Sequence, residues 1–291
     1  MLIKKGSRGN EVREIQEFLE ITADGIFGPG TERAVKKWQS ENGLVDDGIV
    51  GPTTWNAMGL ATTDISEKTY VTETGLQIER FYLDKDEYFT GSNPEYLFIH
   101  HTAGWHNPFK TIKNWNNDTR GCVATEFVIG GQSIEGDDDR YDGKVVQALP
   151  EGGWGWHLGT GRSYMHQHSV GIELNNFGYI KNGRTYVNTR AHRSQVVTLN
   201  SEFKGYTDWH KYSDAQIESL RKLILHIADR DNIDVREGLP KWIKKMGLKA
   251  FEYSSDARSG KVKGLLSHTN VNKGKYDVSP QANLIDMLIE L

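Results

Sequence analysis

The sequence predicts two domains: a small all-α bundle of three helices, then a larger α/β domain in which helices flank a mixed central sheet. Two short Gly-Pro turns, each leading into a helical pattern, lie in the first 60 residues. After a polar, Thr-rich run, strand-like and helix-like segments alternate to the end of the chain. We therefore place the first domain at 1–60, a linker at 61–72 and the second domain at 73–291.

The first domain is built on a repeated turn. The segment "DGIFGPGT" begins at Asp24 and "DGIVGPTT" begins at Asp47. In each, Gly and Pro favour a turn, and a Thr that can cap a helix follows. Ahead of them, Val12, Ile15 and Leu19 lie near the spacing of one apolar helix face. A short repeated turn often serves only to make the fold, so by itself it does not indicate a ligand.

Four apolar runs in the second domain predict strands, and three amphipathic runs predict helices. The runs that predict strands are "YLFIHH", "TEFVIGG", "KVVQAL" and "SVGIELN", and those that predict helices are "FKTIKNWNND", "SDAQIESLRKLILHIADRDN" and "PQANLIDMLIEL". Ser213 opens the second of these helices, and Gln216 follows three residues later, as in a capping box. We expect the apolar stripe of this helix to lie in the core.

Composition and charge exclude several classes of protein. The net charge of -4 over 291 residues gives no broad basic surface, which argues against nucleic acid as a partner. Cys122 is the single cysteine, so disulfides within the chain and cysteine-rich zinc clusters are excluded. No apolar run is long enough for a membrane span. The start, "MLIKKGSRGNEV", is unlike a signal peptide, so we expect a protein made in the cytoplasm.

Two adjacent histidines end the first strand-like run, in "YLFIHHTAG". Successive side chains of a strand point to opposite faces, so His100 and His101 cannot both face one site while the strand continues. Strand ends are where open sheets place their sites. Alternation alone does not decide which of the two histidines is functional.

Two further segments carry groups that suit zinc. His268 and Asp277 lie nine residues apart in "SHTNVNKGKYD", with Lys275 two residues before the aspartate. Two histidines and one aspartate leave one tetrahedral position of Zn²⁺ open, as in catalytic sites. Glu173 lies inside "SVGIELN", on the face opposite its two apolar neighbours, where it faces either solvent or a site.

These residue types together suit metal-assisted hydrolysis of an amide. Zinc lowers the pKa of its water to about 7. Partial burial of Glu173 would raise its pKa toward the working range of a general base. Lys275 would stabilise the oxyanion that forms at an attacked carbonyl. The acidic segment 131–142, "GQSIEGDDDRYD", lacks the Gly and distal Glu of a calcium loop, so we interpret it as a solvated hairpin tip.

Both domains resemble known families. The first resembles the N-terminal type of peptidoglycan-binding domain in "LIKKGSRGNEVREIQ", in both Asp-Gly-Ile turns and in "AVKKWQSENGLVDDG". The second resembles zinc-dependent type 2 N-acetylmuramoyl-L-alanine amidases, which share their fold with peptidoglycan recognition proteins. The segments that carry this resemblance, in chain order, are "FIHHTAG", "ATEFVIGG", "DGKVVQALPEGGWGWHLG", "HSVGIELNN" and "LSHTNVNKGKYDVSP".

The resemblance implies cleavage of the amide between the lactyl group of N-acetylmuramic acid and L-alanine in bacterial peptidoglycan. It implies that His100, His268 and Asp277 bind zinc, with His101 packed behind the strand. It further implies Glu173 as the catalytic base and Lys275 as the oxyanion group. The side chains that we expect to line the substrate groove are His157, Trp156, Thr102 and Asn176.

The chain also departs from the resemblance. Many relatives have His in place of Glu126, and residues 131–141 and 177–212 are insertions that could shape the groove. Two alternatives stay open: a protein that binds peptidoglycan without cutting it, and a zinc peptidase that cuts within the stem peptide. We expect a monomer that acts as a phage endolysin, released from the cytoplasm by a holin.

Overall fold

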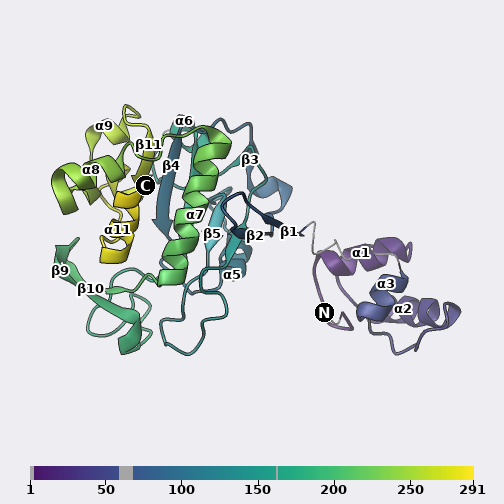
Figure 1. Cartoon of the computed structure of the whole chain (residues 1–291). Coiled ribbons are helices and arrows are strands. Elements are labelled where there is room, and N and C mark those ends of the chain that lie inside the picture. Colours follow the sequence, from purple (N-terminus) through teal and green to yellow (C-terminus); the bar gives the residue numbers. More distant parts are fainter. Residues whose placement is uncertain (1–2, 59–67, 162) are drawn as a thin grey trace. The chain divides into compact units, whose positions relative to one another are not determined.

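The computed structural model describes residues 3–58, 68–161 and 163–291. The chain divides into two compact units, Met1–Lys68 and Thr69–Leu291 (Figure 1). Residues 61–67 of the predicted linker 61–72 lie outside the described residues. Its last part does not behave as a linker, because Thr69–Val71 form strand β1, which pairs antiparallel with β2 (Gln77–Arg80). The second unit therefore starts before residue 73.

The first unit is the predicted bundle of three helices. They are α1 (Asn10–Phe18), α2 (Pro29–Glu41) and α3 (Pro52–Ala57). Pro29 lies in the first turn of α2, where its missing N–H leaves no hydrogen bond unmade. The side chains that form the core are Ile3, Val12, Ile15, Phe27, Val35, Val50, Trp55 and Met58.

A buried glutamine holds each of the two repeated turns. Gln16 Nε2 donates to Asp24 Oδ1, to the Ile26 carbonyl and to Thr31 Oγ1, at 2.8–3.1 Å, and its Oε1 accepts from the Gly25 amide at 2.8 Å. Gln39 makes the same four bonds, at 2.9–3.1 Å, to the residues 23 positions further on. The repeated Asp-Gly-Ile and Thr residues therefore have a structural role, as a short repeated turn often does.

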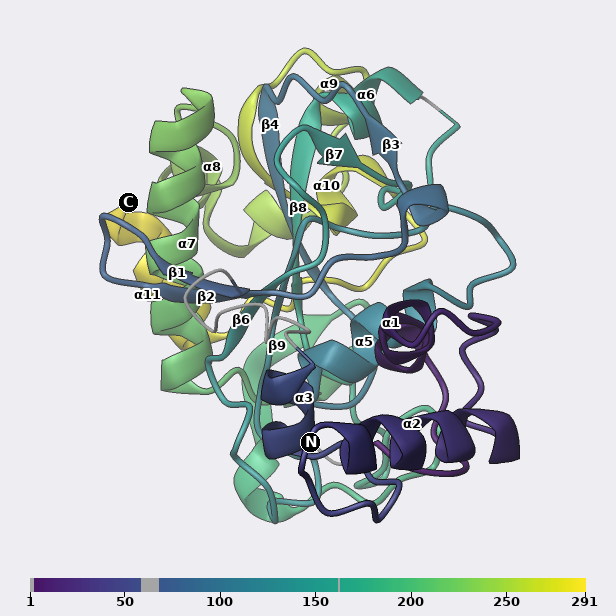
Figure 2. The same cartoon turned by 90° about the vertical axis from the view of Figure 1, so that its right-hand side faces the viewer.

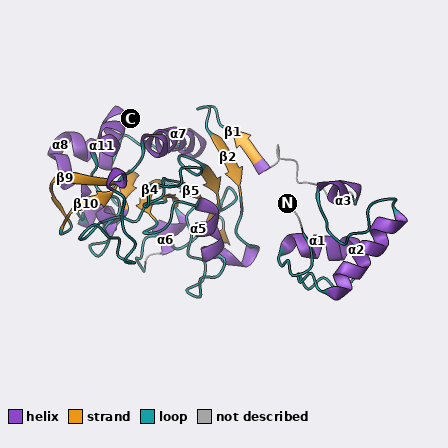
Figure 3. Ribbon diagram, turned by 90° about the horizontal axis from the view of Figure 1, so that it is seen from below, coloured by secondary structure: helices purple, strands orange, loops and turns teal. Residues whose placement is uncertain are grey.

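The second unit is organised around a seven-stranded mixed sheet in the order β1-β2-β6-β5-β8-β4-β11. Figure 3 shows strands β1, β2, β4 and β5 of this sheet from below. The pairs β5–β8, β8–β4 and β4–β11 are parallel, whereas β5 and β6 are antiparallel. The predicted α/β domain with a mixed sheet is confirmed. The bounds of the strands not yet given are β4 Tyr96–His101, β5 Phe127–Ile129, β6 Val145–Gln147, β8 Ser169–Leu174 and β11 Gly264–Ser267.

Helices cover both faces of this sheet (Figures 1 and 2). Leu97 and Ile99 of β4 face one side, where α7 (Asp214–Asp231), α8 (Leu239–Met246) and α11 (Ala282–Glu290) complete the main core. Phe98 faces the other side, with α6, α9 and α10. The bounds of the helices on this second side are α5 Pro108–Trp115, α6 Ser163–Gln167, α9 Ser255–Arg258 and α10 His268–Val271.

The predicted capping box of α7 is half formed. Ser213 Oγ accepts from the Gln216 amide at 3.0 Å, as expected of an N-cap. The Gln216 side chain does not return to Ser213, because it donates instead to the carbonyls of Ile129, Gly130 and Asn175 at the ends of β5 and β8. This buried amide thus ties α7 to the edge of the sheet where the candidate site lies.

Two small hairpin-like pairs complete the second unit. The strand β3 (Phe89–Thr90) pairs antiparallel with β7 (Gly153–Trp154). The predicted insertion 177–212 contains the antiparallel pair β9 (Val196–Phe203) and β10 (Tyr206–His210). In the described part of the chain, no helix combines the length and the apolar character needed to cross a membrane.

Candidate metal centre and substrate groove

Three neighbouring parallel strands bring the candidate residues to one edge of the sheet. His100 in β4 lies in register with Glu173 in β8. Ser267, the last residue of β11, pairs with Ile99, so His268 follows beside His100. Side chains at equivalent positions of parallel neighbours point to the same face. The register therefore places Glu173, His100 and His268 in one row, on the face opposite α7.

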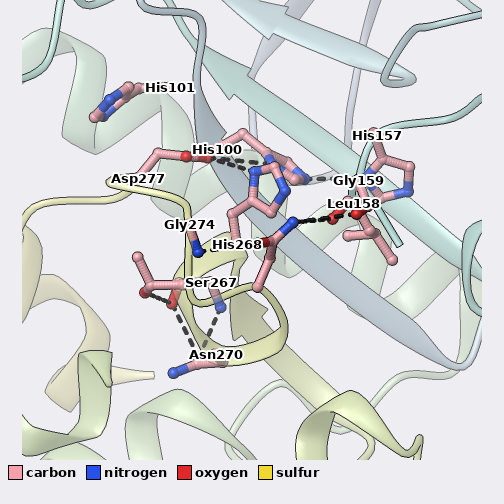
Figure 4. Close-up of polar contacts among 12 residues, drawn as sticks. His100, His101, His157, Leu158, Gly159, Ser267, His268, Asn270, Gly274 and Asp277 are labelled. Atoms are coloured by element: carbon pink, nitrogen blue, oxygen red, sulfur yellow. Dashed lines mark hydrogen bonds and ion pairs between the residues drawn. The ribbon is translucent and has the colours of Figure 1, made fainter. Parts of the chain in front are cut away.

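Three buried donor atoms converge at this edge (Figure 4). His268 Nδ1 lies 2.9 Å from His100 Nδ1 and 2.9 Å from Asp277 Oδ2, and His100 Nδ1 lies 3.3 Å from Asp277 Oδ2. A circle through the three atoms has a radius of about 1.8 Å, which is shorter than the ~2.0–2.2 Å bonds of zinc to nitrogen and oxygen. One zinc ion can therefore contact all three atoms.

The protonation states of these groups suit a cation. Burial, reinforced by the neighbouring His268, lowers the pKa of His100 to about 4. Burial alone would raise the pKa of Asp277, but His268 and His100 hold it well below its usual range. At neutral pH His100 is therefore a neutral imidazole and Asp277 a carboxylate. Neutral imidazole and carboxylate are ligand forms that zinc accepts.

A hydrogen-bond chain behind His100 fixes its tautomer. Ser169 Oγ donates to the His166 carbonyl, so it accepts from His157 Nε2, at 2.8 Å. His157 Nδ1 then has no proton and accepts from His100 Nε2, at 2.9 Å. His100 Nδ1 consequently presents a lone pair to the metal site, an assignment that follows from the network. The Nε2 of His268 is buried and has no hydrogen-bond partner among the described residues.

A glycine makes room for this chain of bonds. Gly171 lies in β8, two residues before Glu173 and on the same face of the strand. A Cβ added at Gly171 would lie 2.6 Å from Thr125 Cγ2 and 3.1 Å from His157 Nδ1. A side chain at this position would therefore displace Thr125 and crowd the Nδ1 atom of His157 that accepts from His100.

The second histidine of the pair lies on the other face of the sheet, as expected. His101 points away from His100 (Figure 4), and its Nδ1 lies 3.1 Å from the Tyr212 hydroxyl. This partner is a buried side chain in the main core. Tyr212 also accepts from the amide of Ser279, two residues beyond Asp277, so His101 supports the segment that carries the third ligand.

Two connected hollows form a groove along this edge. The proximal hollow, of about 490 Å³, includes His268, Lys275, Tyr276 and Asp277 in its lining. The distal hollow, of about 350 Å³, is lined on its far side by Lys110 and other polar side chains of the α5 region. Glu173, Thr102, Ala103, Trp115, Arg120, Phe177 and Tyr186 line both hollows. Volumes of this size accommodate small-molecule or peptide ligands.

Glu173 lies at the junction of the two hollows. Burial raises the pKa of its carboxyl group well above the usual range, Asp277 adds to this effect and Lys275 opposes it. Its Oε2 is buried without a hydrogen-bond partner in the described residues. An unpaired carboxylate with a raised pKa beside a cation site is suited to accept a proton.

Of the four side chains predicted to line the groove, three do so. Trp156, His157 and Thr102 line the proximal hollow. Asn176 does not line either hollow. Its side chain is buried and donates to the carbonyls of His210 and Lys211, while its Oδ1 accepts from the Gly178 amide. Asn176 therefore holds the start of the insertion 177–212 and does not reach the substrate.

Glu126 does not alter the metal centre. Its carboxylate is buried and paired with Arg230, at 2.6 and 3.0 Å, and accepts from Gln147 at 3.0 Å. This pair joins the end of α7 to the sheet, and Glu126 lines neither hollow. The connection between β5 and β6 is a hairpin, in which Asp138 pairs with Arg140. Within the described ranges, His100, His268 and Asp277 form the single cluster of this kind that could hold a metal.

Sequence reasoning missed several residues that position the site. Asn272 donates to the carbonyls of Leu158 and Gly159 and accepts from the Gly274 amide, which fixes the loop before Lys275. Asn270 accepts from the Ser267 amide and thereby fixes the start of α10, where His268 lies. An Asn three residues after a Ser is a recognisable capping pattern, and the bond of Asn272 to the Gly274 amide is a local turn. The contacts of Asn272 with Leu158 and Gly159 are long-range and leave no local signal.

The fold and site define an α/β protein with a buried His₂Asp donor set at the edge of a mixed sheet. Residues 90–277 match the model of the N-acetylmuramoyl-L-alanine amidase family, and residues 8–58 match that of a putative peptidoglycan binding domain. The first match spans more than half of the chain. The chain therefore belongs to the N-acetylmuramoyl-L-alanine amidase family, which confirms the resemblance seen in the sequence.

Individual relatives match shorter parts. A zinc D-Ala-D-Ala carboxypeptidase of Streptomyces albus G is 40% identical over 62 residues, which is 19% of this chain and 24% of that protein. A spore cortex-lytic enzyme of Oceanobacillus iheyensis is 36% identical over 78 residues, 25% of this chain and 28% of that protein. The chain thus spans about a quarter of the length of these curated relatives. An N-acetylmuramoyl-L-alanine amidase structure from Clostridium intestinale covers 67% of this chain and 85% of its own, at 15% identity and a TM-score of 0.35.

Proposed function

We propose that this protein hydrolyses the amide between the lactyl group of N-acetylmuramic acid and L-alanine in bacterial peptidoglycan. The observation that supports it is the row of Glu173, His100 and His268, completed by Asp277, at the edge of a groove. Family membership fixes the class of reaction that such a row is suited to catalyse.

We propose zinc as the cofactor, held by His100, His268 and Asp277. The fit is supported by the triangle of buried donor atoms and by the lone pair that His157 directs from His100 toward the site. When bound, zinc supplies Lewis-acid activation of water and of the substrate carbonyl.

The surrounding side chains would move protons and balance charge. Glu173 would accept a proton from the attacking water and deliver it to the leaving amine, because its raised pKa suits both steps. The Lys275 ammonium, which lines the same hollow, would stabilise the negative charge on the attacked carbonyl oxygen. The groove on both sides of Glu173 would hold the two parts of the substrate.

The test compares two variants on purified peptidoglycan. Glu173→Gln should keep zinc and lose turnover, whereas Asp277→Ala should lose zinc as measured by metal analysis. The wild type should release new L-alanine amino termini without new reducing sugars. New reducing ends alone would indicate a glycosidase, and fragments cut inside the stem peptide, seen by mass spectrometry, would indicate a peptidase. A fully active Glu173→Gln enzyme would refute the general-base assignment.

We also propose that the first unit binds the wall polymer, supported by its match to a putative peptidoglycan binding domain. Deleting residues 1–60 should weaken sedimentation with cell walls and spare cleavage of soluble muropeptides. Loss of both would show that the two units act together.

The finer role that we propose is that of a monomeric endolysin, released from the cytoplasm by a holin. Expression in host cells with and without a holin tests it, because lysis should require the holin. Lysis without the holin would contradict this role, and light scattering of the purified protein tests the oligomeric state.

A further inference from the structure

The insertion 177–212 contacts the loop that carries Lys275 and Asp277. Its β9–β10 hairpin (Figure 1) has Lys204 near its tip, and Lys204 Nζ donates to the Lys273 carbonyl at 3.2 Å. Trp209, in β10 of this hairpin, is fully buried in the main core. The hairpin therefore has a fixed base in the core and a polar contact with the loop of the metal site.

Three tyrosines gather where the hairpin meets this loop. Tyr179 and Tyr206 are stacked, with ring centres 3.9 Å apart and planes 10° from parallel. Tyr276 lies 5.5 Å from Tyr179 and 6.2 Å from Tyr206. Trp209 contacts both rings of the stacked pair edge-on. These contacts hold the rings in place before any ligand arrives, which reduces the entropy that a ligand must lose to order them.

Two of these rings face the groove beside the metal site. Tyr179 and Tyr276 line the proximal hollow, together with Lys275 and Asp277, and do not line the distal hollow. Tyr276 is 40% exposed, which is high for a ring that already has two aromatic neighbours. The proximal hollow thus has one wall made of tyrosine rings.

The two ends of the groove differ in chemistry. Aromatic side chains line both hollows, among them Trp115, Phe177 and Tyr186. Only the distal hollow adds Asn107, Asn114 and the cation Lys110, which makes no ion pair among the described residues. The substrate of the proposed reaction also has two unlike halves. Its stem peptide carries amides and carboxylates, whereas its sugar ring presents C–H faces of the kind that pack on aromatic rings. We therefore place the stem peptide in the distal hollow, where Lys110 and the amide side chains suit its carboxylates and amides, and the sugar against the tyrosine rings.

We propose that Tyr179 and Tyr276, backed by Tyr206, form a subsite that stacks against the N-acetylmuramyl ring next to the scissile amide. The inference rests on the proposed function and adds a determinant of substrate choice. The insertion 177–212 thereby makes the enzyme favour a stem peptide attached to sugar over the same peptide carrying only a lactyl group.

The test uses two soluble substrates that share the scissile bond: an N-acetylmuramyl peptide, and the same peptide acylated with D-lactate and lacking the sugar. The wild type should cleave the first with the higher kcat/KM. The double variant Tyr179→Ala/Tyr276→Ala should raise KM for the muramyl peptide about tenfold or more. Its kcat/KM should fall by much less on the lactyl peptide than on the muramyl peptide.

Matched variants separate stacking from other effects. Tyr179→Phe/Tyr276→Phe keeps the ring faces and should retain the preference for sugar. Tyr164, an exposed tyrosine stacked on His168 outside the groove, serves as the control Tyr164→Ala and should change neither substrate. An equal loss on both substrates in the alanine variant would overturn the subsite and assign the rings to support of the loop.

Other results discriminate the two proposals. Equal cleavage of both substrates by the wild type would overturn the subsite and leave the amidase proposal standing. Cleavage of neither substrate would refute the amidase proposal itself, and the subsite with it. Calorimetry with the N-acetylglucosaminyl-N-acetylmuramic acid disaccharide gives a readout without turnover. Binding to the wild type that the alanine variant loses would support the subsite, and unchanged binding would overturn it.

Discussion

Replacing His157 with phenylalanine tests how the metal site is held in shape. The imidazole of His157 accepts from His100 Nε2 at 2.9 Å and is itself oriented by Ser169 at 2.8 Å. Phenylalanine fills much of the same space but accepts no hydrogen bond. His157→Phe would therefore leave the buried Nε2–H of His100 unpaired and remove the constraint that presents Nδ1 to the metal.

His157→Phe is expected to weaken the binding of zinc. Removing the partner of a metal-bound histidine typically weakens metal binding by about 10–100-fold. This corresponds to about 1.4–2.7 kcal/mol, within the ~1–3 kcal/mol cost of leaving one buried donor unsatisfied. Ser169→Ala acts one bond further away, so it should weaken zinc binding by less than about tenfold.

Competition with a chromophoric chelator measures this affinity directly. His226→Phe is a matched control, because His226 pairs with Glu73 and lies in α7, on the face of the sheet opposite the metal ligands. It should leave zinc affinity unchanged, and circular dichroism should show that all three variants are folded without metal. His157 also lines the groove, so KM is measured as well. An unchanged zinc affinity with a raised KM would refute the positioning role and leave only a substrate contact.

Three further predictions concern space, the repeated turns and charge. Gly171→Ala should crowd His157 and weaken zinc binding in the chelator assay, whereas Gly161→Ala, whose added Cβ meets nothing, should not. Gln39→Leu should destabilise the first unit by about 1–3 kcal/mol, because buried donors and acceptors lose their partner, and calorimetry should show no shift in the transition of the second unit. Burial raises the pKa of Glu173 in the folded protein above its value in the unfolded chain. The protonated side chain therefore contributes its full stability below the unfolded-state pKa, and this stability is lost as the pH rises through the folded-state pKa. In zinc-free protein, Glu173→Gln should therefore melt at a higher temperature than the wild type at pH 8, and the difference should vanish near pH 4.

Local signals in the sequence predicted most of the fold and the ligand types. The apolar run ending in His100 and His101 has the bounds of β4, and the stripe after Ser213 became α7. The strand β11 was missed, because a strand of four residues, Gly264–Ser267, is too short to show a clear alternation of apolar and polar side chains. It also follows a run rich in Lys and Gly, which does not favour a strand. Its core position comes from pairing with β4, which is a tertiary effect.

The errors in the site have a common physical origin. Asn176 follows a strand that runs to the site, so it was expected to line the groove, whereas the role of Glu126 was left open. Each instead satisfies a buried partner: backbone carbonyls for Asn176 and the Arg230 guanidinium for Glu126. The position of a polar residue in the sequence predicts that it lies near the end of a strand. It does not show which buried polar groups nearby need a hydrogen-bond partner.

The register of β4 against its neighbouring strands decides which histidine of the pair lies at the metal site. Alternation divides the pair, so that His100 points to the other metal-binding side chains and His101 contacts the Tyr212 hydroxyl. A shift of one residue in β4 would exchange the two faces and bring Ile99 or His101, depending on its direction, to the place of His100. The apolar side chains of β4 on the α7 face resist such a shift, because they would lose their place in the core. The same packing that buries Leu97 and Ile99 therefore selects His100 as the residue beside Glu173 and His268.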